Sequence, residues 1–159
     1  MLLASFASAQ DNTVKAYVVL NPAGDFVGHL KVVSGFATVQ GDQYQAKNVV
    51  VDLNSLVTGF ETRDDHAKNK YLEVKKFPQA VLLEASGSKN QGKARIKLRD
   101  QIQEVGGTYK VINAGKSISA DFKIKLSEFG IKDISYKGIG VEDDVRIEVV
   151  IPVKAATAE

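Results

Sequence analysis

The residues best suited to do chemistry lie close together in one stretch, residues 52–78. Arg63, Asp64, Asp65 and His66 follow one another there and offer a cation, two carboxylates and an imidazole. Side chains of these types serve general acid–base catalysis when they converge on one point. Consecutive residues of a helix point in different directions, so this run does not form a converging set. The favoured interpretation is helix capping and surface ion pairing, and an anion-binding rim is the alternative.

Other catalytic and metal-binding patterns are missing from the sequence. There is no cysteine, which excludes disulfides, thiol catalysis and Cys-zinc sites. The two histidines, His29 and His66, lack the spacing of a metal motif such as HExxH, and no GxSxG nucleophile motif occurs. Residues 138–140 (Gly-Ile-Gly) lie between strand-like segments, so a phosphate cradle is a weak interpretation. The sequence therefore predicts no catalytic residue, no metal and no cofactor.

Length and composition are those of one globular domain. The chain has 159 residues, of which 25% are charged and 44% hydrophobic. Its net charge of +2 is too small to argue for binding to nucleic acid. No stretch approaches the roughly 20 apolar residues of a membrane span, so we expect no stable membrane insertion.

The N-terminal residues point to a secreted precursor. Residues 1–9 are apolar and small, and Ala7-Ser8-Ala9 has the A-x-A form of a signal-peptidase site. The basic region of a full signal is missing, so residues 1–9 are interpreted as the remnant of a secretory signal peptide. The alternative is an N-terminus that is alanine-rich by chance. We expect a mature domain of residues 10–159, located in the periplasm or secreted.

One segment of the chain has helical periodicity. Thr62 is a candidate N-cap, with Asp64 in the first turn. Tyr71 and Val74 belong to a short apolar stripe, and Pro78 prevents the helix from continuing. We expect a helical insertion near residues 62–75, of about three turns.

The remainder of the chain alternates apolar and polar residues, as strands do. Residue Gly35 suggests a bulge or bend within one strand unit, and residues 86–92 read as a polar loop. Gly106 and Gly107 read as the turn of a hairpin. Residues 127–144 read as a long connection before the last strand.

About eight strand segments, each with one apolar face and short connections, predict an antiparallel all-β fold. Its apolar face can be buried by closing a barrel or by packing two sheets into a sandwich. Inward positions that mix small and large residues favour the barrel, whose interior can hold one small ligand. The strand pattern alone leaves the sandwich open.

Several motifs in this chain resemble a known family, the YceI-like proteins, which are polyisoprenoid-binding proteins of bacterial periplasms. The matching motifs are Leu53-Asn54-Ser55-Leu56, Thr58-Gly59, Arg63-Asp64-Asp65-His66, Tyr71-Leu72-Glu73-Val74, Phe77-Pro78-Gln79-Ala80, Phe122-Lys123-Ile124 and Phe129-Gly130-Ile131. The chain departs from the commonest form of the family at residues 21–28 and 96–111.

The resemblance implies a lipocalin-like antiparallel barrel with helices closing one end. Its apolar lumen would hold a long-chain amphiphile, a polyisoprenoid or a fatty-acyl lipid. It implies no enzymatic activity and no cofactor, and since relatives can be dimeric, a homodimer is possible.

On this basis, three groups of residues are expected to bind the ligand. Those expected to line the lumen are Val18, Leu30, Val32, Val49, Val51, Leu82, Ile96, Ala120, Phe122, Ile124 and Ile147. Those expected to close its entrance are Leu56, Tyr71, Leu72 and Phe77. Arg63 and His66 are expected to contact a polar head group, because a guanidinium binds phosphate with two hydrogen bonds. For each lumen residue, the alternative is a purely structural place in the core.

The resulting functional hypothesis is a periplasmic binding or carrier protein for a long-chain lipid. Two alternatives stay open. One is a small hydrolase or isomerase that acts on such a lipid through His66 and a carboxylate. The other is an envelope stress protein whose barrel is filled.

Overall fold

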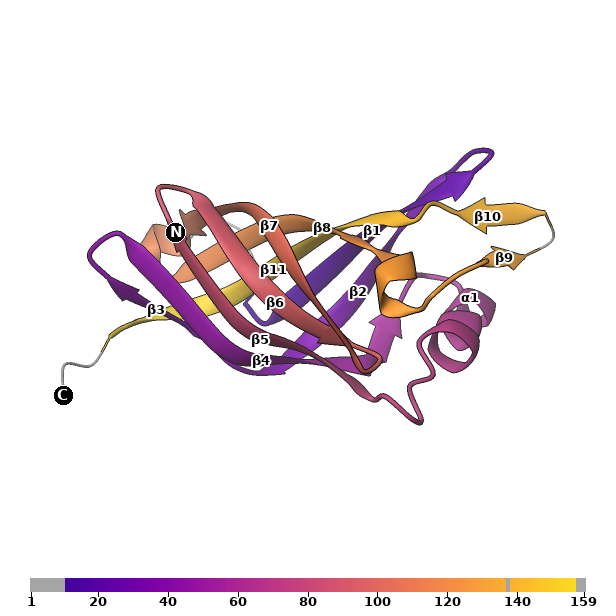
Figure 1. Ribbon diagram of the computed structural model, residues 1–159, viewed down its shortest axis with the longest axis horizontal. Helices are drawn as coiled ribbons and strands as arrows, with labels where there is room; N and C mark the ends of the chain where they lie inside the picture. Colours follow the sequence, from indigo (N-terminus) through magenta and orange to yellow (C-terminus); the bar gives the residue numbers. More distant parts are fainter. Residues whose placement is uncertain (1–10, 137, 157–159) are drawn as a thin grey trace, which may run out of the picture.

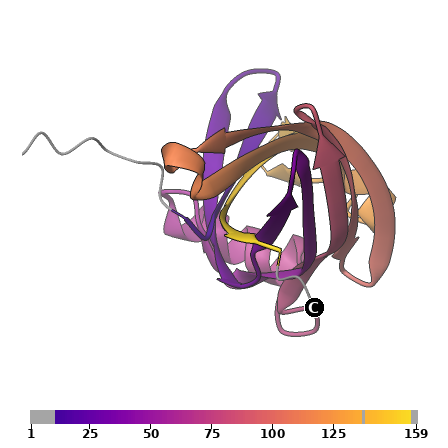
Figure 2. The same ribbon diagram turned by 90° about the vertical axis from the view of Figure 1, so that its left-hand side faces the viewer.

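The fold is a closed ring of antiparallel strands. The computed structural model describes residues 11–136 and 138–156. The strands of the ring are β1 (Thr13–Asn21), β2 (Asp25–Ser34), β4 (Gln43–Val57), β5 (Gln79–Ser88), β6 (Gln91–Leu98), β7 (Gln101–Ile112), β8 (Ser117–Lys125) and β11 (Asp144–Ala155). Each pairs with the next in this order, and β11 pairs with β1 to close the ring. Figure 1 shows the ring from the side, and Figure 2 shows it from the end near β3. The expected lipocalin-like antiparallel barrel of about eight strands is confirmed.

Short elements lie at the two ends of the ring. At one end, β3 (Ala37–Gln40) pairs with β4 and runs parallel to β11. The opposite end carries α1 (Glu61–His66), β9 (Ser135–Tyr136) and β10 (Ile139–Val141), as Figure 1 shows. Three short helical turns complete the fold: η1 (Ala67–Tyr71), of π type, and η2 (Asn113–Gly115) and η3 (Leu126–Phe129), of 3-10 type. The long connection expected at residues 127–144 therefore contains the end of η3 and both β9 and β10.

The bend expected at Gly35 is present between β2 and β3. Gly35 has φ +117°, and a Cβ there would lie 2.7 Å from the Cα of Val49 on the neighbouring strand. A residue with a side chain is excluded by both conditions. The glycine therefore lets the chain bend sharply at the wall of the ring.

Two expected turns are wrong. Gly106 and Gly107 lie inside β7, and the hairpin turn falls instead at Arg99 and Asp100, with φ 55° and 77°. Both values are positive, as two-residue hairpin turns require. The loop expected at residues 86–92 is also mostly strand, because a two-residue turn at Lys89 and Asn90 joins β5 directly to β6.

The helical insertion exists, but its start and end differ from the expectation. Thr62 is not the N-cap: that position is held by Phe60, which makes no side-chain capping bond. The carboxylate of Asp64 instead accepts hydrogen bonds from the backbone N and the Oγ1 of Thr58, at 2.8 and 2.5 Å. Helical structure ends at Tyr71, before the expected end near residue 75, since Glu73 has a positive φ of 51°.

The core consists of the inward faces of the strands. Val49, Ile118 and Val149 are among its buried residues, and each is followed two positions later by another apolar residue of the core. Within the described part of the chain, no helix has both the length and the apolar composition to cross a membrane. The expected signal-peptide remnant, residues 1–9, lies outside the described residues.

Candidate functional site

A large apolar cavity occupies the half of the ring nearest α1. Its volume is about 610 Å³, and side chains from the strands, from α1 and η1, and from the segment that contains β9 and β10 line it. Pockets that hold small ligands typically measure about 300–1,000 Å³ and are mostly apolar. The cavity is therefore large enough for a sizeable ligand.

Most residues expected in the site line this larger cavity. They are Val18, Leu30, Val49, Val51, Leu56, Arg63, His66, Tyr71, Leu72, Leu82, Ile96, Phe122, Ile124 and Ile147. Three expected residues do not line this cavity. Val32 is buried in the core beside Val51, Phe77 packs near the side chains of Lys76 and Arg99, and Ala120 lines a second cavity.

Other lining residues were missed by the sequence interpretation. The alternation that identified Val18 also places Ala16 and Leu20 on the inward face of β1. Ile134 and Ile139 had no such signal, because they belong to the long connection, where no alternation is visible.

The mouth of the larger cavity, the end beside α1, holds a cation close to two aromatic rings. The Arg63 guanidinium carbon lies 4.2 Å from the ring centroid of Phe26 and 4.7 Å from that of Phe60. Guanidinium groups stack favourably on aromatic faces. Among the described residues, no carboxylate forms an ion pair with Arg63. Its N–H groups are thus positioned beside an apolar cavity with their charge unneutralised.

The position of Arg63 depends on the Thr58–Asp64 hydrogen bonds. They join the end of β4 to the first turn of α1, across the bend at Gly59, which has φ +95°. Asp64 is next to Arg63 in α1, so these bonds hold in place the turn of helix that carries Arg63. On the same side, exposed His66 lines the cavity.

Two contacts hold the cover of the mouth together. The hydroxyl of Tyr71 donates to the carbonyl of Ser135 at 3.3 Å and accepts from its N–H at 3.4 Å. Arg99, in the β6–β7 turn, forms an ion pair of 2.5 Å with Glu73 and donates at 2.7 Å to the carbonyl of Gly130. These bonds connect the helical insertion to the segment between β8 and β10.

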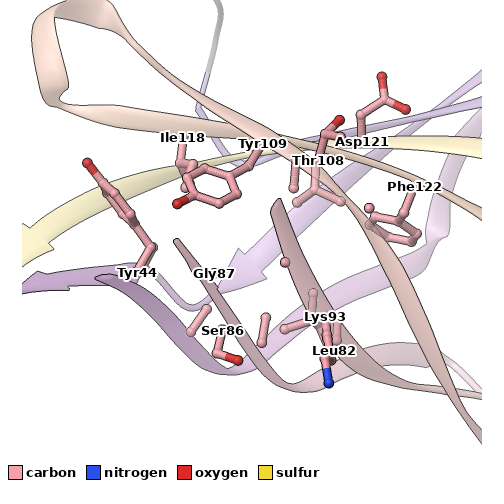
Figure 3. Close-up of a pocket in the computed structure, with 18 of the residues that line it drawn as sticks. Tyr44, Leu82, Ser86, Gly87, Lys93, Thr108, Tyr109, Ile118, Asp121 and Phe122 are labelled. Atoms are coloured by element: carbon pink, nitrogen blue, oxygen red, sulfur yellow. The ribbon is translucent and has the colours of Figure 1, made fainter. Parts of the chain in front are cut away.

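A second, smaller cavity of about 90 Å³ lies in the other half of the ring. Figure 3 shows its labelled residues, among them Tyr44 and Tyr109, whose ring centroids are 5.3 Å apart. Gly87, Gly92 and Gly107 occupy neighbouring positions on its wall, on β5, β6 and β7. The wall is therefore formed there by backbone without side chains.

Comparison with known proteins identifies the family. The model of the YceI-like domain matches residues 7–153. The chain belongs to the YceI-like family. The resemblance seen in the sequence motifs is thus confirmed. No relative among the curated proteins matches it.

Two solved structures share the YceI-like fold with this chain. One is a polyisoprenoid-binding domain from Saccharophagus degradans implicated in plant cell wall breakdown, with 13% identity and a TM-score of 0.58. The match covers 90% of this chain and 94% of that one. The other is BcnA from Burkholderia cenocepacia, with 18% identity and a TM-score of 0.60, covering 85% of this chain and 92% of that one.

The YceI-like motif residues have structural roles here that explain their spacing. Thr58 and Asp64 make the bonds described above, and the Glu73 carboxylate accepts a hydrogen bond from the Arg99 guanidinium. Phe129 is almost fully buried, and Gly130 follows it with φ +77° to end η3. These residues set the position of the cover; the lumen itself requires only apolar inward side chains.

Strong electrostatic interactions lie outside the larger cavity. Hydrogen bonds from Arg146 lower the pKa of Asp121, through Nε–Oδ1 and Nε–Oδ2 distances of 3.0 and 2.9 Å. Hydrogen bonds from the Ser127 Oγ and backbone N lower the pKa of Asp143. In the described part of the chain, no group of three or more His, Cys, Asp or Glu side chains could hold a metal ion.

Proposed function

We propose that this YceI-like protein binds one long-chain amphiphilic lipid, a polyisoprenoid or a fatty-acyl compound. The tail occupies the larger cavity and the head group lies at the mouth, against Arg63. The observation behind the proposal is an apolar cavity of about 610 Å³ with an unneutralised guanidinium at its mouth.

The tail supplies most of the binding free energy in this mode. Removal of a methylene group from water contributes about 0.8 kcal/mol, so about twelve carbons give about 10 kcal/mol before the costs of association. Such burial needs no directional contact. This agrees with a wall made of residues such as Val49, Ile96 and Ile124.

The head group is an anion in this proposal. Phosphate or carboxylate oxygens accept two parallel hydrogen bonds from one guanidinium. The rings of Phe26 and Phe60 lie over the Arg63 guanidinium carbon and supply no hydrogen-bond acceptor, so its N–H groups are left for the ligand. His66 lies close enough to line the same end of the cavity.

We propose binding without turnover, as a carrier in the periplasm or outside the cell. The family and the description of the Saccharophagus degradans domain as polyisoprenoid-binding support the ligand class. Of the carboxylates near His66 that a hydrolase or isomerase could use, that of Asp64 already accepts two hydrogen bonds from Thr58.

Calorimetric titration with two lipids tests this proposal. Geranylgeranyl pyrophosphate supplies an anionic head group, and oleamide supplies a neutral one on a similar tail. We expect Arg63→Ala to weaken the pyrophosphate about 10- to 100-fold, as for hydrogen bonds to a charged group, and the amide less than about threefold.

Lys70→Ala is the matched control, because Lys70 is an exposed cation 5.3 Å from the Tyr71 ring in the same helical segment. It should weaken neither lipid. Absence of binding by the unaltered protein contradicts the proposed function, and equal losses for both lipids contradict the head-group role. Mass spectrometry of the extracted lipid after incubation should return it intact; a converted product would support the enzyme alternative.

A further inference from the structure

A partition of side chains separates the two cavities. Leu82, Phe122 and Val149 line both the larger and the smaller cavity. Leu82 comes from β5, and Phe122 and Val149 come from the paired strands β8 and β11, so they reach into the lumen from two parts of the ring. In Figure 3, Phe122 and Leu82 both lie to the right of Tyr44, Phe122 in the upper part of the view and Leu82 in the lower part.

Phe122 is the largest side chain of this partition, and a row of glycines lies beside it on the neighbouring strands. It is paired with Gly107, which is paired with Gly92, which is paired with Gly87. A Cβ on Gly107 would lie 2.8 Å from the Cβ of Phe122, so both positions face the lumen. The row continues to Tyr44, which pairs with Gly87, and the Tyr109 ring covers Gly87, so Phe122 is the large side chain at the end of the row that borders the larger cavity.

The volumes on each side of Phe122 are very different. A water molecule occupies roughly 30 Å³ in the liquid, and if a methylene group is given the same space, the larger cavity of about 610 Å³ holds about twenty groups and the smaller one of about 90 Å³ about three. An engineered apolar cavity of about 150 Å³ binds benzene. The smaller cavity is therefore too small for a ligand of its own, but it could extend the larger one.

We infer that Phe122 sets the maximum length of the bound hydrocarbon chain. The ligand is then a single chain of about twenty carbons or fewer, such as a diterpenoid or a common fatty acyl chain. This inference rests on the proposed function, because Arg63 fixes the head group at the mouth while Phe122 blocks the far end. A longer chain must give up one of these two positions.

A series of prenyl pyrophosphates tests the limit by calorimetric titration. Farnesyl, geranylgeranyl and geranylfarnesyl pyrophosphate have chains of fifteen, twenty and twenty-five carbons. We expect affinity for the unaltered protein to rise about tenfold or more from the first to the second, and to rise no further with the third.

Phe122→Ala should move this limit by one isoprene unit, because the space left by the phenyl group connects the larger cavity to the smaller one. We expect the twenty-five-carbon chain to bind this variant about tenfold more tightly than the unaltered protein. Ala120→Leu in the same variant should reverse the gain, since Ala120 lines only the smaller cavity. Leu82→Ala opens the partition from β5 and gives the same test if Phe122→Ala does not fold.

Ile124→Ala is the matched control. Ile124 is on the same strand and face, and it lines only the larger cavity. Its loss should weaken all three ligands without changing the length limit. Affinity that keeps rising to twenty-five carbons in the unaltered protein overturns the inference, as does an unchanged limit in both partition variants. Absence of binding at every length overturns the proposed function itself.

Discussion

Gly106 and Gly107 are adjacent in β7, yet their replacement by alanine should have opposite effects on stability. A Cβ on Gly107 would lie 2.4 Å from the carbonyl oxygen of Asp121 and 2.8 Å from the Cβ of Phe122. The nearest atom to a Cβ on Gly106 is the carbonyl oxygen of Gly92, at 3.8 Å, an ordinary contact. Among the described residues, neither glycine has a positive φ.

The size of each effect follows from these distances. The Asp121 oxygen belongs to the backbone of β8, so it cannot move aside like the end of a flexible side chain. Overpacking of this kind costs about 1–3 kcal/mol, and the 2.4 Å contact places Gly107→Ala in the upper part, about 2–3 kcal/mol. Gly106→Ala has no such cost and restricts the unfolded chain, which adds up to about 1 kcal/mol of stability.

Thermal unfolding followed by circular dichroism is a suitable assay, because the chain has no tryptophan for fluorescence. At about 2–4 °C for each kcal/mol in a domain of this size, Gly107→Ala should lower the melting temperature by about 4–12 °C. Gly106→Ala should leave it unchanged or raise it by up to about 4 °C. Comparable destabilisation by both variants would refute the reasoning, since that is the result expected if the pair formed a turn that needs positive φ.

Two further predictions concern the cover of the mouth and its acid sensitivity. Arg99→Ala removes the bonds to Glu73 and Gly130, so it should lower the free energy of unfolding by about 1–2 kcal/mol and speed hydrogen exchange at residues 71–77. Arg95→Ala is the control: its 3.8 Å ion pair with Glu84 is exposed, so its loss should change stability by less than about 0.5 kcal/mol. Equal effects of the two variants would contradict the role of Arg99. Because the folded pKa of Asp143 is lowered by Ser127, this carboxylate stabilises the fold above its unfolded pKa of about 3.9 and ceases to do so as pH falls through its folded value. Ser127→Ala should therefore reduce the fall in melting temperature between about pH 5 and pH 3, and identical pH profiles would count against it.

The strands were predictable because alternate residues of each strand are buried, so apolar and polar residues alternate in the sequence. In β11, Val145, Ile147, Val149 and Ile151 share the inward face, and this pattern is visible without any structure. The turns were harder to predict, since residue type alone does not determine φ. Arg99 and Asp100 take positive φ because the pairing of β6 with β7 leaves only these two residues to form the turn. The turn was expected at Gly106 and Gly107 instead, because glycine adopts positive φ most readily.

The lining of the lumen was likewise partly predictable, but its division was not. Alternation identifies inward residues one strand at a time. The partition depends on the register that aligns Gly87, Gly92, Gly107 and Phe122 across four strands. The mouth has the same dependence on long-range contact, because Phe26 reaches Arg63 only through the pairing of β2 with β4. Neither arrangement leaves a local pattern in the sequence.

This architecture allows a nearly featureless apolar cavity to select its ligand. Hydrophobic contacts along the wall are non-directional, so the wall alone would accept any chain that fits. In the proposed mode, selection comes from the two ends: Arg63 favours an anionic head group, and Phe122 excludes chains that are too long. The distance between these residues then acts as the specificity determinant. It follows that exchanges along the wall, such as Ile124→Ala, should alter affinity, whereas only changes at the ends should alter which lipid binds best.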